Sequence, residues 1–208
     1  MTSTFDLQYV AKQIPIFTTI LEDHGEVNKY LKEIILEHRQ KFPESTKSNV
    51  KAWHSSWHTH KENPKFQPLV ERVITGVNFI SHGYFHCNPD QTNFQVTNLW
   101  CMMYEDTEWT KRHCHYPSDF AAVYYVDVEP GSAPVIFESV VKDGTNDNNQ
   151  PLTLQPQNGM LAIWSALLHH EVPPTKGRRM CISMNIDKGS TYGTKWSEIP
   201  SGSTIIEP

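Results

Sequence analysis

The sequence lacks a long apolar run, a basic cluster and a leader-like start. No apolar stretch approaches the roughly 20 residues of a membrane span, and no basic segment followed by an apolar one opens the chain. The formal net charge is -5, and lysine and arginine are not clustered. Nucleic-acid binding requires concentrated cations. We therefore expect a cytoplasmic protein, or one of the host cytoplasm if it is viral, that binds neither membranes nor nucleic acids.

Cysteine is also scarce, and its spacing argues against both a CxxC site and a disulfide-crosslinked fold. The chain has four cysteines, none of which forms a CxxC pair. They are too few and too widely spaced to crosslink 208 residues. We expect reduced thiols that mostly pack in the interior. A chain of this length suits one domain and can bury roughly 70% of the surface that its unfolded form exposes.

Histidine, in contrast, is abundant and grouped. Most of the eleven histidines fall in the stretches "WHSSWHTH", "SHGYFH", "HCH" and "HH". A soluble protein seldom groups imidazoles without using some of them, so these stretches are the first candidates for a functional site.

The apolar pattern divides the chain into a helical part and a β part. Apolar residues follow helical spacing in 26–41, with Asp23 as a candidate N-cap and Pro43 beyond the end, and again in 65–80. From about residue 93, short β-type runs alternate with turn residues. We expect a single domain, mainly β with flanking N-terminal helices. In it, 1–92 supports a β core at 93–187 and 188–208 is a tail.

Two of the grouped histidines are separated by one residue in "HCH". On an extended strand His113 and His115 would point to the same side, with Cα atoms about 6.6 Å apart, and could bind one metal ion. A metal site needs a third ligand. The pair His169 and His170 follows a later β run, and neighbours on a strand point to opposite faces, so only one of them can join. We expect His170. The alternative is that these are ordinary structural histidines.

The last strong β run carries a cation on a polar face. Arg179, Cys181, Ser183 and Asn185 alternate with apolar residues, which predicts that one face packs on another layer while the polar face lines a cavity. A guanidinium in a cavity favours a carboxylate ligand. In "FAAVYYVDV", a regular strand would put Asp119, Ala121, Val123, Tyr125 and Asp127 on one face, so Tyr125 could reach the same carboxylate. The alternative is a polar face in solvent.

The ordered motifs resemble a known family. "HCHYPSDFAAVYYV", "GMLAIW" and "LLHHEVPPTKGRRMCISMNI" are similar to the double-stranded β-helix (jelly-roll) core of the Fe(II)- and 2-oxoglutarate-dependent oxygenases. Together with "KSNVKAWHSS", they resemble more narrowly a group found in marine bacteria and their phages. The resemblance runs over about residues 14–187, and "AWHSS" belongs to it without an assignable role.

The resemblance implies a mechanism and a set of roles. Fe(II) would be the cofactor and 2-oxoglutarate the cosubstrate, and the reaction would hydroxylate an unactivated C–H bond with release of succinate and CO2. His113 would be the first iron ligand and His170 the distal one. Arg179 would hold the C5 carboxylate of 2-oxoglutarate, with Tyr125 as a hydrogen-bonding helper. No residue is needed as a general base.

The sequence departs from the family at one ligand position. Most members carry His-x-Asp or His-x-Glu, giving two histidines and one carboxylate, whereas this chain has His115 there. The site could be a three-histidine site, or Asp119 could supply the carboxylate. The spacing of His113, His115 and Asp119 also resembles the metal-binding motif of the cupins, which share the same barrel. A cupin-like metalloenzyme that does not use 2-oxoglutarate, or a catalytically silent β-barrel binding module, is therefore the alternative. Arg179 discriminates, because a cupin needs no buried cation there.

The substrate is expected to be a small molecule or a protein side chain, recognised by loops such as "WHSSWHTHKENPK" and "KDGTNDNNQP". The first contains His54, His58 and His60, whose spacing could form a second metal site or simply belong to a solvated loop. The sequence leaves the oligomeric state open, with a dimer as one option.

Overall fold

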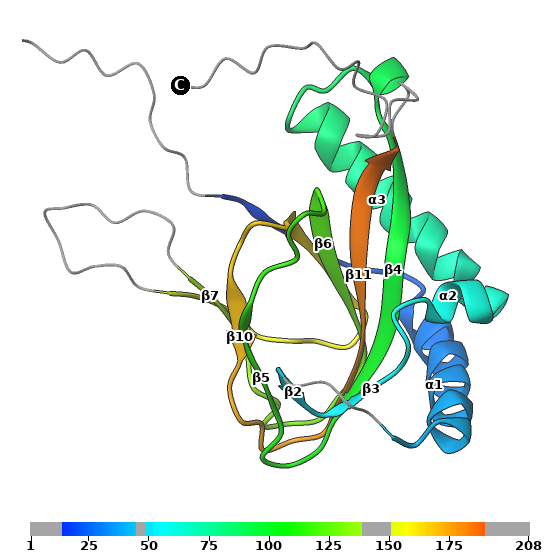
Figure 1. The fold of residues 1–208 in the computed structure, drawn as a ribbon, viewed down its shortest axis with the longest axis vertical. Coiled ribbons are helices and arrows are strands. Elements are labelled where there is room, and N and C mark those ends of the chain that lie inside the picture. The colour runs from blue at the N-terminus through cyan, green and yellow to red at the C-terminus, as the bar shows by residue number, and fades with distance from the viewer. Residues whose placement is uncertain (1–13, 45–48, 139–150, 190–208) are drawn as a thin grey trace, which may run out of the picture.

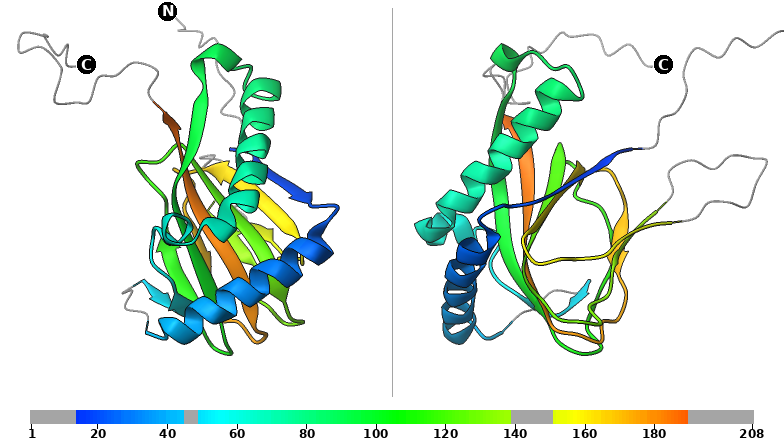
Figure 2. Two further views of the ribbon diagram at one scale, coloured as in Figure 1. Left: turned by 90° about the vertical axis from the view of Figure 1, so that its right-hand side faces the viewer. Right: turned by 180° about the vertical axis from the view of Figure 1, so that it is seen from behind.

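Two β-sheets face each other, and helices cover the outer side of the larger sheet (Figure 1). The structure is a computed structural model that describes residues 14–44, 49–138 and 151–189. Most of the polar loop "KDGTNDNNQP" and of the tail 188–208 lies outside these ranges. The two further views in Figure 2 show the helices on one side only, as predicted for a mainly β fold with flanking N-terminal helices.

The two sheets differ in size. The larger has six strands, in the order β1 (Ile16–Ile20), β9 (Met160–Ser165), β6 (Phe120–Val128), β11 (Arg179–Gly189), β4 (Asn93–Tyr104) and β3 (Trp53–His54). The smaller has five, in the order β2 (Val50–Lys51), β5 (Trp109–His113), β10 (His170–Val172), β7 (Val135–Phe137) and β8 (Leu152–Leu154). All named pairs are antiparallel.

Two long helices account for the apolar patterns of the first half. The helix α1 spans His24–Lys41 and α3 spans Gln67–Gly83. Short helical turns complete the part of the chain that the structure describes: α2 (Thr59–Glu62), η1 (Pro64–Phe66) and η2 (Pro89–Gln91). Asp23 precedes α1 but makes no side-chain cap. Its carboxylate pairs instead with Arg72 of α3, which ties the two helices together.

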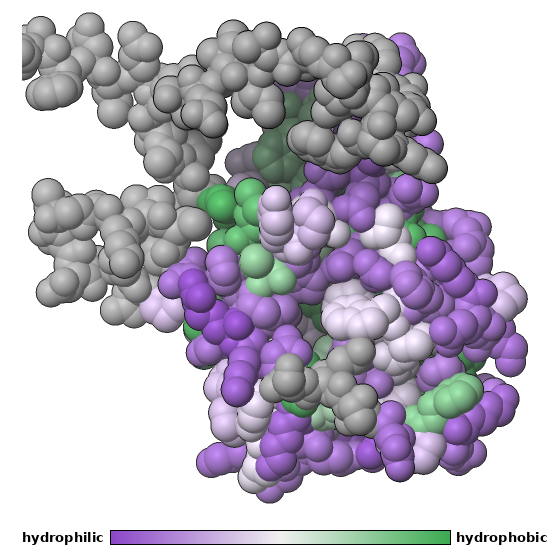
Figure 3. All heavy atoms as spheres, in the orientation of Figure 1, coloured by the Kyte–Doolittle hydropathy of each residue, from purple (hydrophilic) through white to green (hydrophobic). Residues whose placement is uncertain are grey.

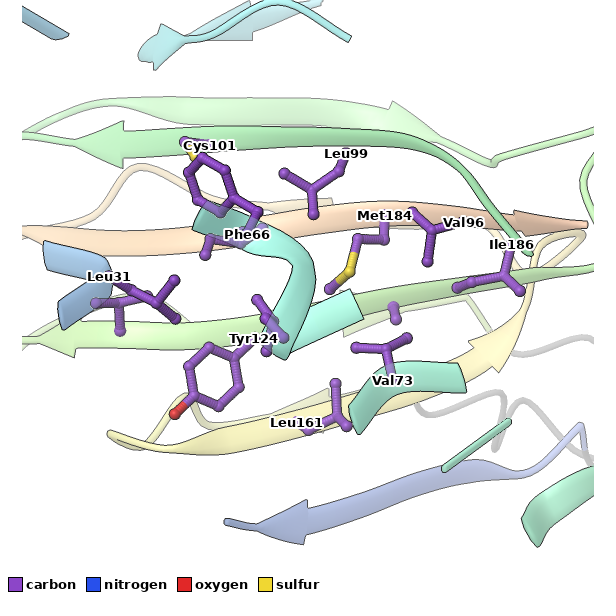
Figure 4. Packing of buried hydrophobic residues seen from close by; sticks show 14 of the residues in the cluster. Leu31, Phe66, Val73, Val96, Leu99, Cys101, Tyr124, Leu161, Met184 and Ile186 are labelled. Carbon is purple, nitrogen blue, oxygen red and sulfur yellow. The ribbon is translucent and has the colours of Figure 1, made fainter. Parts of the chain in front are cut away.

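The core has two layers, one on each face of the larger sheet. Between the helices and the sheet, residues such as Leu31, Phe66, Val73, Tyr124 and Met184 pack closely (Figure 4). Between the two sheets lies a second cluster that is richer in aromatic and sulfur-containing side chains. The outer layer packs the helices against the larger sheet. The inner layer surrounds the space in which the candidate functional residues meet.

The face drawn in Figure 3 is mainly hydrophilic, with small apolar areas. None of the helices in the described ranges combines the length and apolar character that crossing a bilayer requires.

A glycine in the turn before β9 allows a close approach of two segments. Gly159 has φ +79, and a Cβ there would overlap the side chain of His24 at the start of α1. We expect Gly159→Ala to lower the free energy of unfolding by about 2–3 kcal/mol, because left-handed backbone strain and steric overlap add. Chemical denaturation would measure this. Gly83→Ala is the matched control, since a Cβ at Gly83 meets nothing within 4 Å. Equal stability of the two variants would contradict the prediction.

Candidate metal centre

Three histidines converge where the smaller sheet pairs β5 with β10. His113 ends β5, and its register partner across the ladder is His170, the first residue of β10. His115 follows β5, and its backbone N–H donates at 2.8 Å to the carbonyl of Ala166, which lies in the turn between β9 and β10. One ring nitrogen from each of His113, His115 and His170 lies within 4.8 Å of the others. The structure therefore brings the three predicted ligands together, and their role as ligands stays a prediction.

Each of the three rings donates from Nδ1 to an oxygen. Nδ1 of His113 donates to the Lys111 carbonyl at 2.8 Å, and Nδ1 of His170 donates to the Leu168 carbonyl at 3.0 Å. Nδ1 of His115 donates to the side-chain oxygen of Asn185 at 2.6 Å. Because these oxygens only accept, the proton of each neutral ring is on Nδ1 and the lone pair is on Nε2. Such partners fix the tautomer of metal-binding histidines.

The surroundings keep these imidazoles neutral. Burial lowers the pKa of His115 to about 4, and the neighbouring His113 adds to this effect. Burial also lowers the pKa of His170 well below its usual value, and the pKa of His113 is lowered by the same cause. Metal binding requires deprotonated imidazole. At neutral pH no proton has to leave before an ion can bind.

The spacing of two ring nitrogens tests whether an ion fits. Nε2 of His115 lies 3.3 Å from Nε2 of His170, and the ring planes are nearly parallel at 5°. Two lone pairs cannot hydrogen-bond to each other, so this approach is unfavourable unless a cation binds both. Imidazole ligands at right angles, each about 2.1 Å from an ion, would be about 3.0 Å apart. The donor set therefore fits a transition metal, and imidazole suits iron among others.

The other candidate ligands lie elsewhere. The carboxylate of Asp119 accepts the backbone N–H of Lys188 at 2.7 Å, and Asp119 is not in the histidine group. His54, His58 and His60 form no metal-binding group either, because the three converging histidines are the one such group in the described residues. Among the described residues, no carboxylate joins the three histidines and no second metal-binding group is found.

A cavity of about 270 Å³ runs from the histidines to Arg179. The side chain of Arg179 is 1% exposed. Its Nη1 donates to the Ala133 carbonyl at 2.9 Å, and its guanidinium carbon lies 4.3 Å from the ring centre of Tyr104 and 5.8 Å from that of Tyr125. No described Asp or Glu pairs with it, and its Nε has no acceptor among the described residues. A buried cation without an anion is costly, so the cavity favours an anionic ligand.

Tyr125 lies beside Arg179, as the strand pattern predicted. Its hydroxyl is buried and has no hydrogen-bond partner among the described residues. Burial raises its pKa, so it remains a donor. Ala121, Val123 and Tyr125 share the inner face. The regular alternation fails after Tyr125, because Cys181 pairs with Tyr125 while Met180 pairs with Asp127.

The irregularity in β6 turns one predicted residue away from the cavity. The register leaves one extra residue in β6, a β-bulge, and a bulge switches the side to which the following side chains point. Asp127 consequently pairs with Lys32 of α1 at 2.6 Å, on the helix side. The expectation that Asp127 shares a face with Tyr125 is wrong for this reason.

Two polar residues of the cavity were missed from the sequence. Tyr104 is the register partner of Arg179 on β4, and its hydroxyl lies 2.6 Å from the hydroxyl of Thr110 on β5. Burial raises the pKa of Tyr104 to about 12. Both residues line the cavity. The end of β4 is apolar on both faces, so alternation did not mark which residues point inward.

Aromatic side chains form the wall beside His115. The ring of Trp100 stacks on His115, with 5.7 Å between ring centres, and on His54, with 5.6 Å. Trp57 meets Trp100 edge-on at 4.5 Å. The "AWHSSW" stretch, which had no assignable role in the sequence, thus lines the cavity through His54 and Trp57.

Residues 98–185 match the model of a protein family described as "Putative 2OG-Fe(II) oxygenase". The matched segment contains the three histidines, Tyr125 and Arg179. This family implies Fe(II) and 2-oxoglutarate, and the histidine triad could bind the metal. The match supports an oxidoreductase of the 2-oxoglutarate and Fe(II) class. A search of curated proteins found no match.

Solved structures with a similar fold include several oxygenases of this class. A Pseudomonas putida prolyl-4-hydroxylase superposes with a TM-score of 0.63 at 13% identity, covering 85% of this chain and 94% of that one. A Trichoplax adhaerens prolyl hydroxylase, in complex with a hypoxia inducible factor peptide, gives 0.58 at 12%, covering 83% of each. The 2-oxoglutarate-dependent carbocyclase of nogalamycin biosynthesis gives 0.63 at 11%, covering 86% and 82%. At these identities the likeness shows the fold, a double-stranded β-helix core as predicted.

Proposed function

We propose that this protein is an Fe(II)- and 2-oxoglutarate-dependent oxygenase that hydroxylates an unactivated C–H bond. One observation carries the proposal: a single cavity holds three inward-facing imidazoles and a buried guanidinium without a described carboxylate partner. The imidazoles suit the metal, and the guanidinium suits the distal carboxylate of a dicarboxylate that also reaches the metal. A cupin-like metalloenzyme has no use for the guanidinium.

The residues of the chain bind and orient the reactants. His113, His115 and His170 would hold the metal through Nε2, with each tautomer fixed by the partner of Nδ1. Arg179 would pair with the C5 carboxylate of 2-oxoglutarate, and the hydroxyl of Tyr125 would donate to the same group. When bound, the metal would supply oxidative chemistry with O2 and 2-oxoglutarate, in which one oxygen atom would enter the succinate that forms with CO2 and the other would enter the new hydroxyl group of the substrate.

The ligand set changes the charge of the centre. Three neutral imidazoles leave a divalent ion with its full positive charge, whereas the more common carboxylate ligand would cancel one unit. An anionic chelating cosubstrate would therefore contribute more of the charge balance here. Apolar side chains such as Val123, Val135 and Val172 line part of the cavity wall, where they offer water no hydrogen-bond partner.

Anaerobic titration tests the proposed function directly. Fe(II) and then 2-oxoglutarate are added to purified apo-protein, and we expect a visible charge-transfer band only after the second addition, because it reports chelation of the metal by the 2-oxo acid. Succinate should form once air is admitted. Analogues of 2-oxoglutarate that lack the 2-oxo group are the matched control, because they cannot chelate the metal in the same way. Absence of both the band and succinate formation would overturn the proposal.

We propose a substrate that is a small molecule or a protein side chain, and a place among the oxygenases of marine bacteria and phages acting in the cytoplasm. The resemblance of "KSNVKAWHSS" and the later motifs supports the group, and the negative net charge supports a partner other than nucleic acid.

A further inference from the structure

Asn185 contacts His115 on the side of the ring opposite the metal-facing nitrogen. Its side-chain oxygen accepts from Nδ1 of His115 at 2.6 Å. Its Nδ2 donates to the side-chain oxygen of Asn98 at 3.2 Å. Because the amide nitrogen is bound to Asn98, the amide oxygen faces His115. The orientation of the amide is therefore set by two partners, one on each side.

The strand pairing next to Asn185 is irregular. Asn185 pairs with Asn98 across β11 and β4, but the next residue of β11, Ile186, pairs with Val96. Thr97 is thus an extra residue in β4, and its hydroxyl donates to the Asn185 carbonyl at 3.4 Å. Bulges of this kind re-aim side chains and occur next to active sites.

The face of the same imidazole is held as well. Trp100 stacks on His115 with an angle of 21° between the ring planes, and His54 stacks on Trp100 with an angle of 11°. Among the three histidines, His115 has the largest set of side-chain contacts that restrict its ring. The other two rings donate from Nδ1 to main-chain carbonyls, so Asn185 is the one side-chain acceptor of the three.

We propose that Asn185 is a positioning residue for the third metal ligand: it fixes the tautomer and orientation of His115 so that Nε2 faces the metal. The inference rests on the proposed metal site and deepens it. A carboxylate ligand at the position of His115 would have two equivalent oxygens and no tautomer to select. The imidazole in its place requires an acceptor at Nδ1, and Asn185 provides one in neutral form.

Metal affinity tests the role without relying on turnover. With Co(II) as the metal added to apo-protein, we expect Asn185→Ala to bind about 10- to 100-fold more weakly than the wild type, the usual loss when an outer hydrogen-bond partner of a ligand is removed. Asn185→Asp keeps the size and the acceptor, so its affinity should equal or exceed that of the wild type. Ser183→Ala is the matched control, because Ser183 lines the same cavity from β11 while its hydroxyl bonds to the sulfur of Met102, at 3.9 Å, and not to a histidine among the described residues.

A spectroscopic signature separates positioning from general damage. In the Co(II)-loaded protein, the Nδ1–H proton of each ligand histidine gives a strongly shifted NMR resonance that is lost by exchange in D2O. In Asn185→Ala we expect faster exchange for one of the three resonances, with the other two unchanged. If Asn185→Ala does not fold, Asn185→Asp decides the question, since weaker binding by this isosteric variant would contradict the role.

The outcomes distinguish two failures. If the wild type does not bind Co(II), the proposed metal site is wrong, and the role of Asn185 falls with it. If the wild type binds and Asn185→Ala matches it within twofold, with all three resonances unchanged, only the role of Asn185 is overturned. Loss of affinity in Ser183→Ala to the same extent would also overturn it.

Discussion

Replacing Arg179 with alanine should weaken 2-oxoglutarate binding about 30-fold to several thousand-fold, while Fe(II) binding is retained. The range corresponds to about 2–5 kcal/mol, the usual cost of truncating one partner of a buried, hydrogen-bonded charge pair. In this protein Arg179 is 1% exposed, and no described acidic side chain competes for its charge. Titration of the Fe(II)-loaded protein with 2-oxoglutarate, followed by the visible band, would measure the loss.

The neighbouring residue offers a matched control for this experiment. Arg178 is adjacent in sequence, but its side chain is partly exposed and pairs with Glu129 at 2.9 Å, away from the cavity. Arg178→Ala should therefore bind 2-oxoglutarate as the wild type does. Arg179→Met preserves most of the buried volume and should show the same loss as Arg179→Ala. Unchanged affinity in both Arg179 variants would exclude this residue as the carboxylate partner.

His115→Ala should lower the affinity for Fe(II) more than about 100-fold, because loss of a direct ligand exceeds the 10- to 100-fold effect of losing an outer partner. Asp119→Ala should leave the affinity unchanged, since the Asp119 carboxylate accepts from the backbone of Lys188 and is not in the histidine group. Anaerobic competition with a chromogenic chelator would measure both affinities.

Comparing these two variants decides which residue completes the metal site. Asp119→Ala also removes a hydrogen bond that holds the end of β11, so its thermal unfolding should be followed in parallel. Loss of iron in a folded Asp119→Ala variant, with His115→Ala unaffected, would mean that the carboxylate is the third ligand. That result would overturn the proposed three-histidine ligand set.

Part of the histidine group could be predicted because the spacing of His113 and His115 is local in the sequence. His113 and His115 were placed on one side by strand alternation, although the structure ends β5 at His113. Their meeting with His170 depends on the β5–β10 ladder and on the bond from the His115 amide to Ala166. The structure thus brings the three predicted residues together, and their role as ligands stays a prediction. Their approach also depends on long-range strand pairing, which a local sequence pattern does not contain.

Other features could not be predicted, for reasons that differ. A β-bulge after Tyr125 turned Asp127 toward α1, and no sequence pattern in "YYVDV" marks an extra residue. Tyr104 was missed because β4 is buried on both faces near its end, where alternation carries no information. Asn185 was placed on the cavity side by alternation, but its bond to His115 depends on pairing with Asn98 across the sheet.

The short segment 50–54 joins the two sheets at the edge that β2 and β3 form. Val50 and Lys51 pair with β5, whereas Trp53 and His54 pair with β4, so one residue, Ala52, separates a strand of one sheet from a strand of the other. Opening the seam between β4 and β5 would break backbone ladders in both sheets at once. We infer that amide hydrogens along this seam exchange slowly with solvent and together. The segment lies before residues 98–185, so this connection between the sheets comes from outside the part that matches the family model.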